Sequence, residues 1–297
     1  MKLANKINTS NTGIVSQKKQ KNVKEKGSWR AYGTGTLVSA AATPASLLVV
    51  KGMQKIAGSL TPEQVQQINA ASDTVLAKSG LLDKGVIIEN ITLKDFGNDL
   101  PKSFLADMFF PNVAVAKGKN AYFRHKNPLT KEIDNIIVIN REKLPTAAFH
   151  EIGHAFNANS SKFWGAMQKL RIPAMGLAST LLLFSAFSKN EVAEEGKELT
   201  KFQKMKNFVR NNSGILAFSS MLPVVAEEIA ASVRGCKWAN SNLPKELAKK
   251  VRNTNFIGGI TYIGGSIALG FAAHCAKKVK DKIMANLNIS KQDIQNE

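Results

Sequence analysis

The pentapeptide His150-Glu151-Ile152-Gly153-His154 contains two of the chain's four histidines. Positions i and i+4 of a helix lie on one face about one turn apart, so the imidazoles of His150 and His154 can reach a single Zn²⁺. Glu151 would lie beside the metal without ligating it. Its carboxylate can take the proton from a zinc-bound water, whose pKa the metal lowers to about 7, and return it to a leaving amine. The pentapeptide therefore predicts metal-assisted peptide hydrolysis.

Two histidines do not complete such a site, because zinc peptidases use three protein ligands and a water. The metzincin extension needs a glycine at position 157 and a histidine at position 160. The chain has Asn157 and Ser160 there, which excludes that class. A thermolysin-like site needs a glutamate some twenty residues downstream, but residues 155–190 contain no Asp or Glu.

The acidic residues that follow form two groups. Four of them alternate with lysines in a polar stretch that looks like a solvated linker, and they are the weaker candidates: Glu191, Glu194, Glu195 and Glu198. Glu227 and Glu228 instead end an apolar run, where a carboxylate is expensive to bury unless a cation compensates it. We choose Glu228 as the third ligand, because Ser232 follows it on the same helix face and could hydrogen-bond a ligand. Glu227 is the second choice.

The order of these elements resembles a known family. HExxH, then apolar segments, then Glu228-Ile-Ala-Ala-Ser232 is similar to the membrane-embedded gluzincins typified by the bacterial heat-shock protease HtpX and the eukaryotic CAAX prenyl proteases. In that family a Glu-x-x-Ala-Asp motif after a membrane hairpin supplies the third zinc ligand. The resemblance covers about residues 120–239 and implies that Glu228 is this ligand and that the active site faces the cytoplasm. Ser232 stands where the family has Asp.

Composition favours a membrane surface as the partner of this basic chain. Its 297 residues include 41 basic and 22 acidic side chains, which give a formal charge of +19. Nucleic acid and anionic lipid headgroups are both candidate partners for such a charge. Only 7% of the residues are aromatic, and no RNP, KH or helix-turn-helix signature is evident, so we expect lipid and no nucleic acid. Cys236 and Cys275 lack CxxC spacing and indicate no disulfide framework.

Four uncharged runs are candidates for membrane segments: residues 31–50, 172–188, 211–226 and 253–273. The two middle runs, joined by a charged loop, resemble the hairpin of the family. We expect a multi-pass membrane protein, with a soluble all-helical core as the alternative. Basic residues lie on every connecting segment, so the positive-inside rule does not orient the chain.

The segment before the pentapeptide predicts a small α+β domain. Thr61 and Pro62 open a helix that runs to about Ser79. Residues 86–91 and 136–140 are predicted strands, and residues 112–116 with 121–124 a hairpin. The predicted fold is thus a zincin-like catalytic domain, with a small sheet and the HExxH helix, combined with a helical transmembrane part.

The predicted organisation has seven parts. A disordered basic arm (1–30) precedes a candidate membrane segment (31–58) and the zincin-like domain (59–171). A helical hairpin carrying the third ligand (172–233), a basic linker (234–252), a candidate membrane helix (253–280) and a polar tail (281–297) follow.

The sequence therefore predicts a zinc-dependent metalloendopeptidase that acts on a protein or peptide substrate. His150, His154 and Glu228 would bind Zn²⁺, and Glu151 would be the general base. One alternative is a catalytically silent membrane scaffold that retains the fold, which Ser232 in place of Asp supports. The other is a basic nucleic-acid-binding protein.

Overall fold

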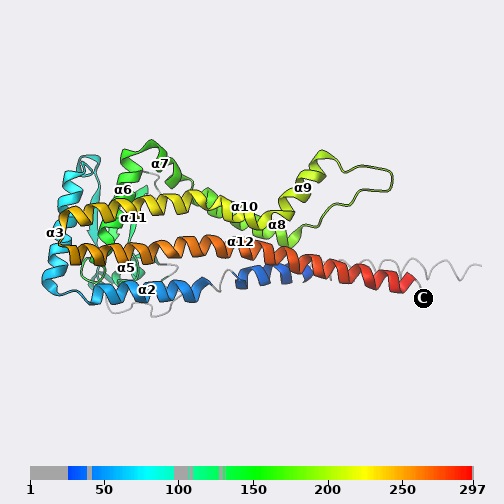
Figure 1. Cartoon of the computed structure of the whole chain (residues 1–297), viewed down its shortest axis with the longest axis horizontal. Coiled ribbons are helices and arrows are strands. Elements are labelled where there is room, and N and C mark those ends of the chain that lie inside the picture. The colour runs from blue at the N-terminus through cyan, green and yellow to red at the C-terminus, as the bar shows by residue number, and fades with distance from the viewer. Residues whose placement is uncertain are drawn as a thin grey trace, which may run out of the picture. The chain divides into compact units, whose positions relative to one another are not determined.

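The computed structural model describes residues 26–38, 42–96, 107, 110–126, 130 and 132–295, and these residues are mostly helical. Two compact units divide the chain. The first comprises residues 1–42, 175–220 and 266–297, and the second comprises residues 43–174 and 221–265. Within the second unit, α11 (Leu222–Asn242) and the first part of α12 (Lys245–Gln295) run side by side (Figure 1).

A three-stranded mixed sheet lies in the second unit. Its order is β1-β3-β2: β1 (Ile87–Asn90) is parallel to β3 (Ile133–Ile139), and β2 (Tyr122–Lys126) is antiparallel to it. The β-branched run of β3 suits a central strand, and its residues 137–139 are buried. Strands at 86–91, 121–124 and 136–140 were predicted, and the structure confirms these three.

The predicted strand at residues 112–116 is wrong. Residues Pro111–Ala116 form a short helix, α5, with the proline in its first turn. Pro111 has no N–H for a ladder hydrogen bond, and residues 113–116 are all buried, so the segment lacks the alternation of a half-buried strand. The 3₁₀ turns Leu82–Lys84 and Leu93–Phe96 flank β1.

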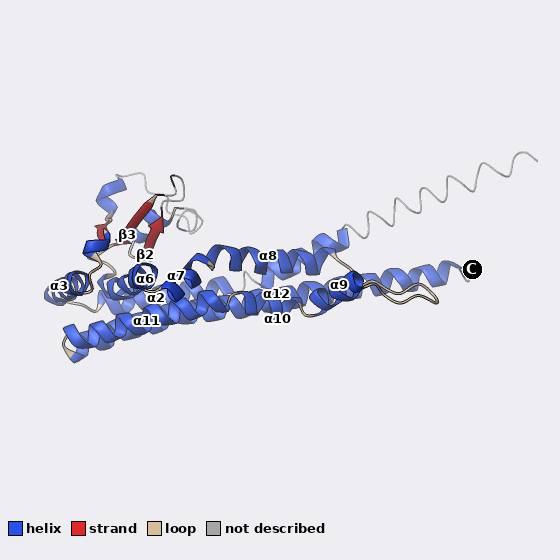
Figure 2. Cartoon of the chain, turned by 90° about the horizontal axis from the view of Figure 1, so that it is seen from above, coloured by secondary structure: helices blue, strands red, loops and turns tan. Residues whose placement is uncertain are grey.

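Two helices frame the sheet. Helix α3 (Pro62–Lys78) begins as predicted, because Thr61 and Gln64 form a reciprocal capping box with Pro62 at the first helical position. Helix α6 (Ala148–Ser160) follows β3 through a 3₁₀ turn, Pro145–Ala147, and lies beside β2 and β3 (Figure 2). Phe149 and Ile152 of α6 share one core cluster with Ile137 and Ile139 of β3. The HExxH residues are thereby fixed against the sheet.

Long apolar helices make up most of the remainder. Besides α11 and α12, α2 (Ala42–Gly58) and α8 (Arg171–Phe187) belong to this group. Three shorter helices also belong to the described chain: α7 (Lys162–Lys169), the basic α9 (Lys201–Asn211) and α10 (Ser213–Ser220). Three helical stretches of the described chain are long and apolar enough to cross a membrane: Lys162–Phe187, Ser213–Asn242 and Lys245–Asn286. Of the predicted N-terminal parts, residues 1–25 of the arm and residues 39–41 of the candidate membrane segment lie outside the described residues.

Candidate metal centre

Helix α6 presents both histidines of the pentapeptide on one face. The Nε2 atoms of His150 and His154 are 2.9 Å apart, and their rings are nearly perpendicular with centroids 4.5 Å apart. His154 is buried and His150 is half-buried. The i, i+4 spacing therefore directs two imidazole nitrogens at one position beside the helix.

Helix α11 brings Glu228 to the same position. Its Oε2 atom lies 3.2 Å from Nε2 of His150 and 3.3 Å from Nε2 of His154. This oxygen is buried and accepts no hydrogen bond from the described residues. Ligand atoms at 2.0–2.1 Å from a tetrahedral zinc ion are about 3.3 Å apart, so the three atoms have the separations that one small cation requires. His150, His154 and Glu228 form the one group of the described chain that could hold a metal ion.

Two glycines allow α6 and α11 to approach so closely. A Cβ atom on Gly153 would lie 2.4 Å from the carbonyl oxygen of Ala231, and a Cβ atom on Gly235 would lie 2.6 Å from the carbonyl oxygen of Phe149. Each glycine thus faces the backbone of the other helix. The backbone of Ala231 therefore passes close to Gly153, the neighbour of His154.

Residues of α11 contact the Nδ1 atoms of both imidazoles. The Ser232 hydroxyl lies 3.1 Å from Nδ1 of His150, and Oε1 of Glu227 lies 2.9 Å from Nδ1 of His154. Asn157 also donates to Oε1 of Glu227 at 3.0 Å. A carboxylate can only accept, so Nδ1 of His154 donates to Glu227, and in the tautomer with its proton on Nδ1 the lone pair is on Nε2. Glu227, the second choice for a ligand, therefore supports a ligand.

Arg171, at the start of α8, is a residue of the candidate site that the sequence did not predict. Its Nη2 atom donates to Oε1 of Glu228 and lies 3.4 Å from Oε2 of Glu227. The sequence signal was available, since two carboxylates at the end of an apolar run need a cation and Arg171 heads the preceding apolar run. Three carboxyl groups in this region are buried: those of Glu151, Glu227 and Glu228. A divalent cation would offset part of their negative charge.

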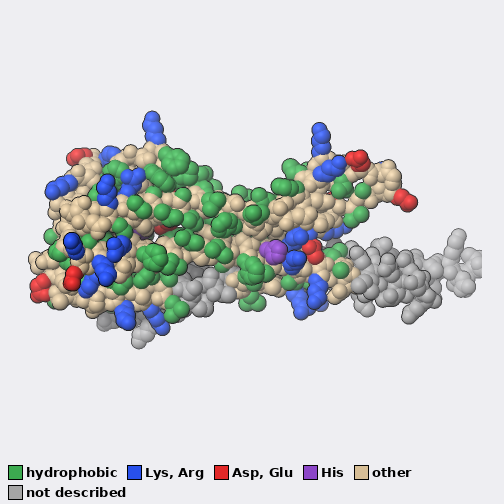
Figure 3. Space-filling model, in the orientation of Figure 1, with side chains coloured by type: hydrophobic (Ala, Val, Ile, Leu, Met, Phe, Trp, Pro, Cys, Tyr) green, Lys and Arg blue, Asp and Glu red, His purple; other side chains and the backbone are tan. Residues whose placement is uncertain are grey.

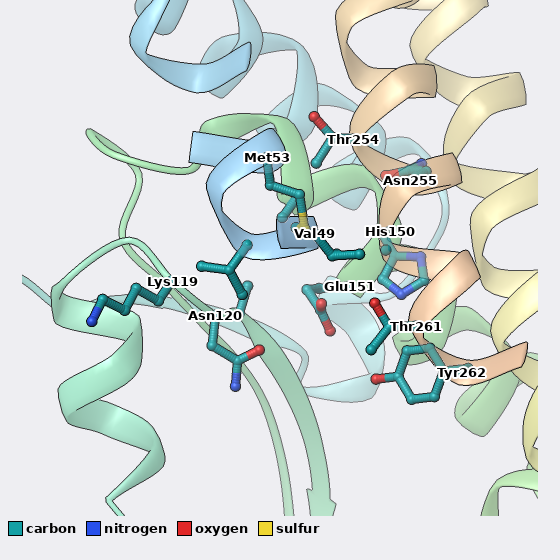
Figure 4. Close-up of a pocket in the computed structure, with 14 residues that line it drawn as sticks. Val49, Met53, Lys119, Asn120, His150, Glu151, Thr254, Asn255, Thr261 and Tyr262 are labelled. Atoms are coloured by element: carbon teal, nitrogen blue, oxygen red, sulfur yellow. The ribbon is translucent and has the colours of Figure 1, made fainter. Parts of the chain in front are cut away.

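Glu151 lines a cavity of about 160 Å³ that also reaches His150. Figure 4 shows its carboxylate in this cavity, with Asn120 on one side and Thr261 and Tyr262 of α12 on the other. Burial lowers the pKa of His150 to about 4, and the neighbouring His154 acts in the same direction. At neutral pH the His150 imidazole is therefore uncharged, which is the form that binds metals.

The other candidate residues lie elsewhere. Glu191, Glu194 and Glu198 of the polar stretch belong to the first unit and pair with Lys206, Lys197 and Lys204. His125, a histidine outside the pentapeptide, lies on β2, where its Nδ1 is 2.7 Å from Oδ1 of Asn135.

Comparison of the chain with protein-family models, with curated proteins and with solved structures found no match. Function is therefore inferred from the geometry of this site.

Proposed function

We propose that the protein is a zinc-dependent metalloendopeptidase of the membrane-embedded gluzincin kind, in which His150, His154 and Glu228 bind Zn²⁺. One observation carries the proposal. The buried Oε2 of Glu228 has no hydrogen-bond donor among the described residues and faces two imidazole nitrogens at 3.2 and 3.3 Å. The neighbouring cavity contains the carboxylate that HExxH chemistry requires.

The residues of the site have distinct tasks in this proposal. A zinc ion held by His150, His154 and Glu228 would supply Lewis acidity, which lowers the pKa of a bound water to about 7. Glu151 takes a proton from the water as its oxygen attacks the carbonyl carbon, and delivers it to the amine nitrogen as the C–N bond breaks. Ser232 and Glu227 keep the imidazoles oriented, and Arg171 holds the free oxygen of Glu228.

A peptide substrate would find hydrogen-bonding groups along this cavity. Asn255 Oδ1 and Thr261 Oγ1 of α12 line it and are buried without a hydrogen-bond partner among the described residues. Strand β2 is at the edge of the described sheet, and Ala121, just before it, lines the same cavity. An extended peptide paired with β2 would be recognised by its main chain, which implies broad sequence tolerance.

The proposal places the zincin-like domain on a multi-pass membrane protein with the active site facing the cytoplasm. Three helical stretches of sufficient length and apolarity support membrane insertion. Retention of the full-length protein in membranes washed with alkaline carbonate is the expected result. Release into the wash would refute insertion and leave the zinc chemistry unaffected.

Purified full-length protein in detergent tests the peptidase directly. We expect one zinc per chain and cleavage of casein. Glu151→Gln should keep the zinc and abolish cleavage, and His150→Ala should lose both. His274→Ala is the matched control, because His274 is exposed and belongs to the first unit. Zinc-loaded wild type that leaves casein intact would favour a silent scaffold, and cleavage by Glu151→Gln would refute the role of Glu151.

A further inference from the structure

A second cavity, of about 620 Å³, lies between α11 and α12 within the second unit. Asn255 of α12 donates a hydrogen bond of 3.5 Å to the sulfur of Cys236 of α11, so these two residues lie opposite each other on the paired helices. Polar residues line the end nearest the turn between the helices: Lys237, Asn240, Ser241 and Arg252. Apolar residues line the other end: Ile229, Val233, Phe256, Ile260 and Ile263. The cavity is therefore amphipathic along its length.

The polar end is positively charged and has no counter-charge. No acidic side chain lines the cavity. Lys237 and Arg252 are both exposed, and neither forms an ion pair with a described residue. Figure 3 shows Lys and Arg side chains around this end of the second unit and hydrophobic side chains further along it. Two free cations above an apolar groove complement an anion that carries a hydrocarbon chain. The cations and the concave shape distinguish the cavity from an ordinary lipid-facing helix surface.

We propose that this cavity binds an anionic phospholipid. The phosphate lies between Lys237 and Arg252, and an acyl chain follows Val233, Ile260 and Ile263. Its volume falls in the range of specific ligand pockets. Ser232 lines this cavity and contacts His150, so the lipid lies against a residue that holds a metal ligand. The inference depends on the membrane location proposed above and not on peptidase activity.

Native mass spectrometry of the purified full chain tests this site. The detergent solution contains equal amounts of phosphatidylglycerol and phosphatidylcholine with identical acyl chains. We expect one phosphatidylglycerol to be retained in preference to phosphatidylcholine. Lys237→Gln and Arg252→Gln should each weaken retention roughly fivefold, the effect of losing one cation near a lipid surface. Lys249→Gln is the control, because Lys249 is an exposed cation of α12 outside the cavity lining.

A second variant tests the acyl chain separately from the charge. Val233 is 62% exposed, so Val233→Trp should fold and block the apolar end. Ile215→Trp, at a 65% exposed position of α10, is its control. Equal retention of the two lipids, or displacement by inorganic phosphate alone, would refute the lipid site. A dimer without lipid that Val233→Trp dissociates would assign the groove to a second copy of the chain. These outcomes do not test the peptidase proposal, which depends on casein cleavage. Release of the protein in the carbonate wash would refute the membrane location.

Discussion

Replacing Gly153 by alanine should separate the two helices that build the metal centre. The new Cβ would lie 2.4 Å from the carbonyl oxygen of Ala231 and 2.9 Å from its carbonyl carbon and Cα. Ordinary Cβ contacts begin near 3.4 Å, so α6 and α11 must move apart by about 1 Å. Glu228 lies one turn before Ala231 on α11, and its Oε2 would retreat from the imidazoles by a similar distance.

The expected effects follow from this displacement. Overpacking costs about 1–3 kcal/mol, which exceeds the ~1 kcal/mol that alanine gains over glycine in a helix. Disturbing the support of metal ligands typically lowers metal affinity about 10–100-fold, and we expect at least this loss. Zinc titration against a chelator of known affinity measures it, and urea unfolding of the metal-free protein measures the stability.

Gly264→Ala is the matched control for this substitution. Gly264 also lies in a helix, but nothing stands within 4 Å of its Cβ position, so alanine there gains helix propensity without a clash. Wild-type zinc affinity in Gly153→Ala, with stability equal to that of Gly264→Ala, would refute the close approach of α6 and α11.

Three further results test the surroundings of the site. Arg171→Gln removes the guanidinium that pairs with the buried Glu227 and Glu228, so we expect the metal-free protein to lose about 3–5 kcal/mol of unfolding free energy in urea. Zinc should then stabilise this variant more than it stabilises the wild type. An unchanged unfolding free energy of the metal-free variant would contradict the ion pairs. Ser232→Ala should lower the zinc affinity about 10–100-fold in chelator competition, whereas Ser232→Asp should preserve it. Equal zinc affinities of Ser232→Ala and wild type would show that Ser232 does not orient His150. The pKa of His150 in the folded protein is about 4, below the ordinary 6.5 of histidine, so the unfolded chain binds this proton first as pH falls. The stability of the metal-free protein should therefore fall as pH drops from about 6.5 to about 4. Denaturant titrations should show a flatter pH dependence for His150→Ala.

The sequence by itself determined the features of this protein that depend only on residues close together in the chain. The i, i+4 histidines share a helix face because helix geometry alone requires it. Thr61, Pro62 and Gln64 set the start of α3 through a capping box within one turn. The β-branched run of β3 likewise predicted a strand, and the lengths of the apolar runs predicted long helices. The strand predicted at residues 112–116 was wrong because a short buried apolar segment fits a strand or a helix equally well.

Only the tertiary structure decided which carboxylate meets the imidazoles. Glu227 is separated from His154 by 73 positions, and no local period spans such a distance. The rotation of α11 against α6, set where Gly153 and Gly235 let the backbones touch, directs Glu228 at Nε2 and leaves Glu227 behind His154. The contacts of Arg171 likewise follow from packing, because its guanidinium on α8 reaches the two buried carboxylates of α11 only after these two helices have assembled.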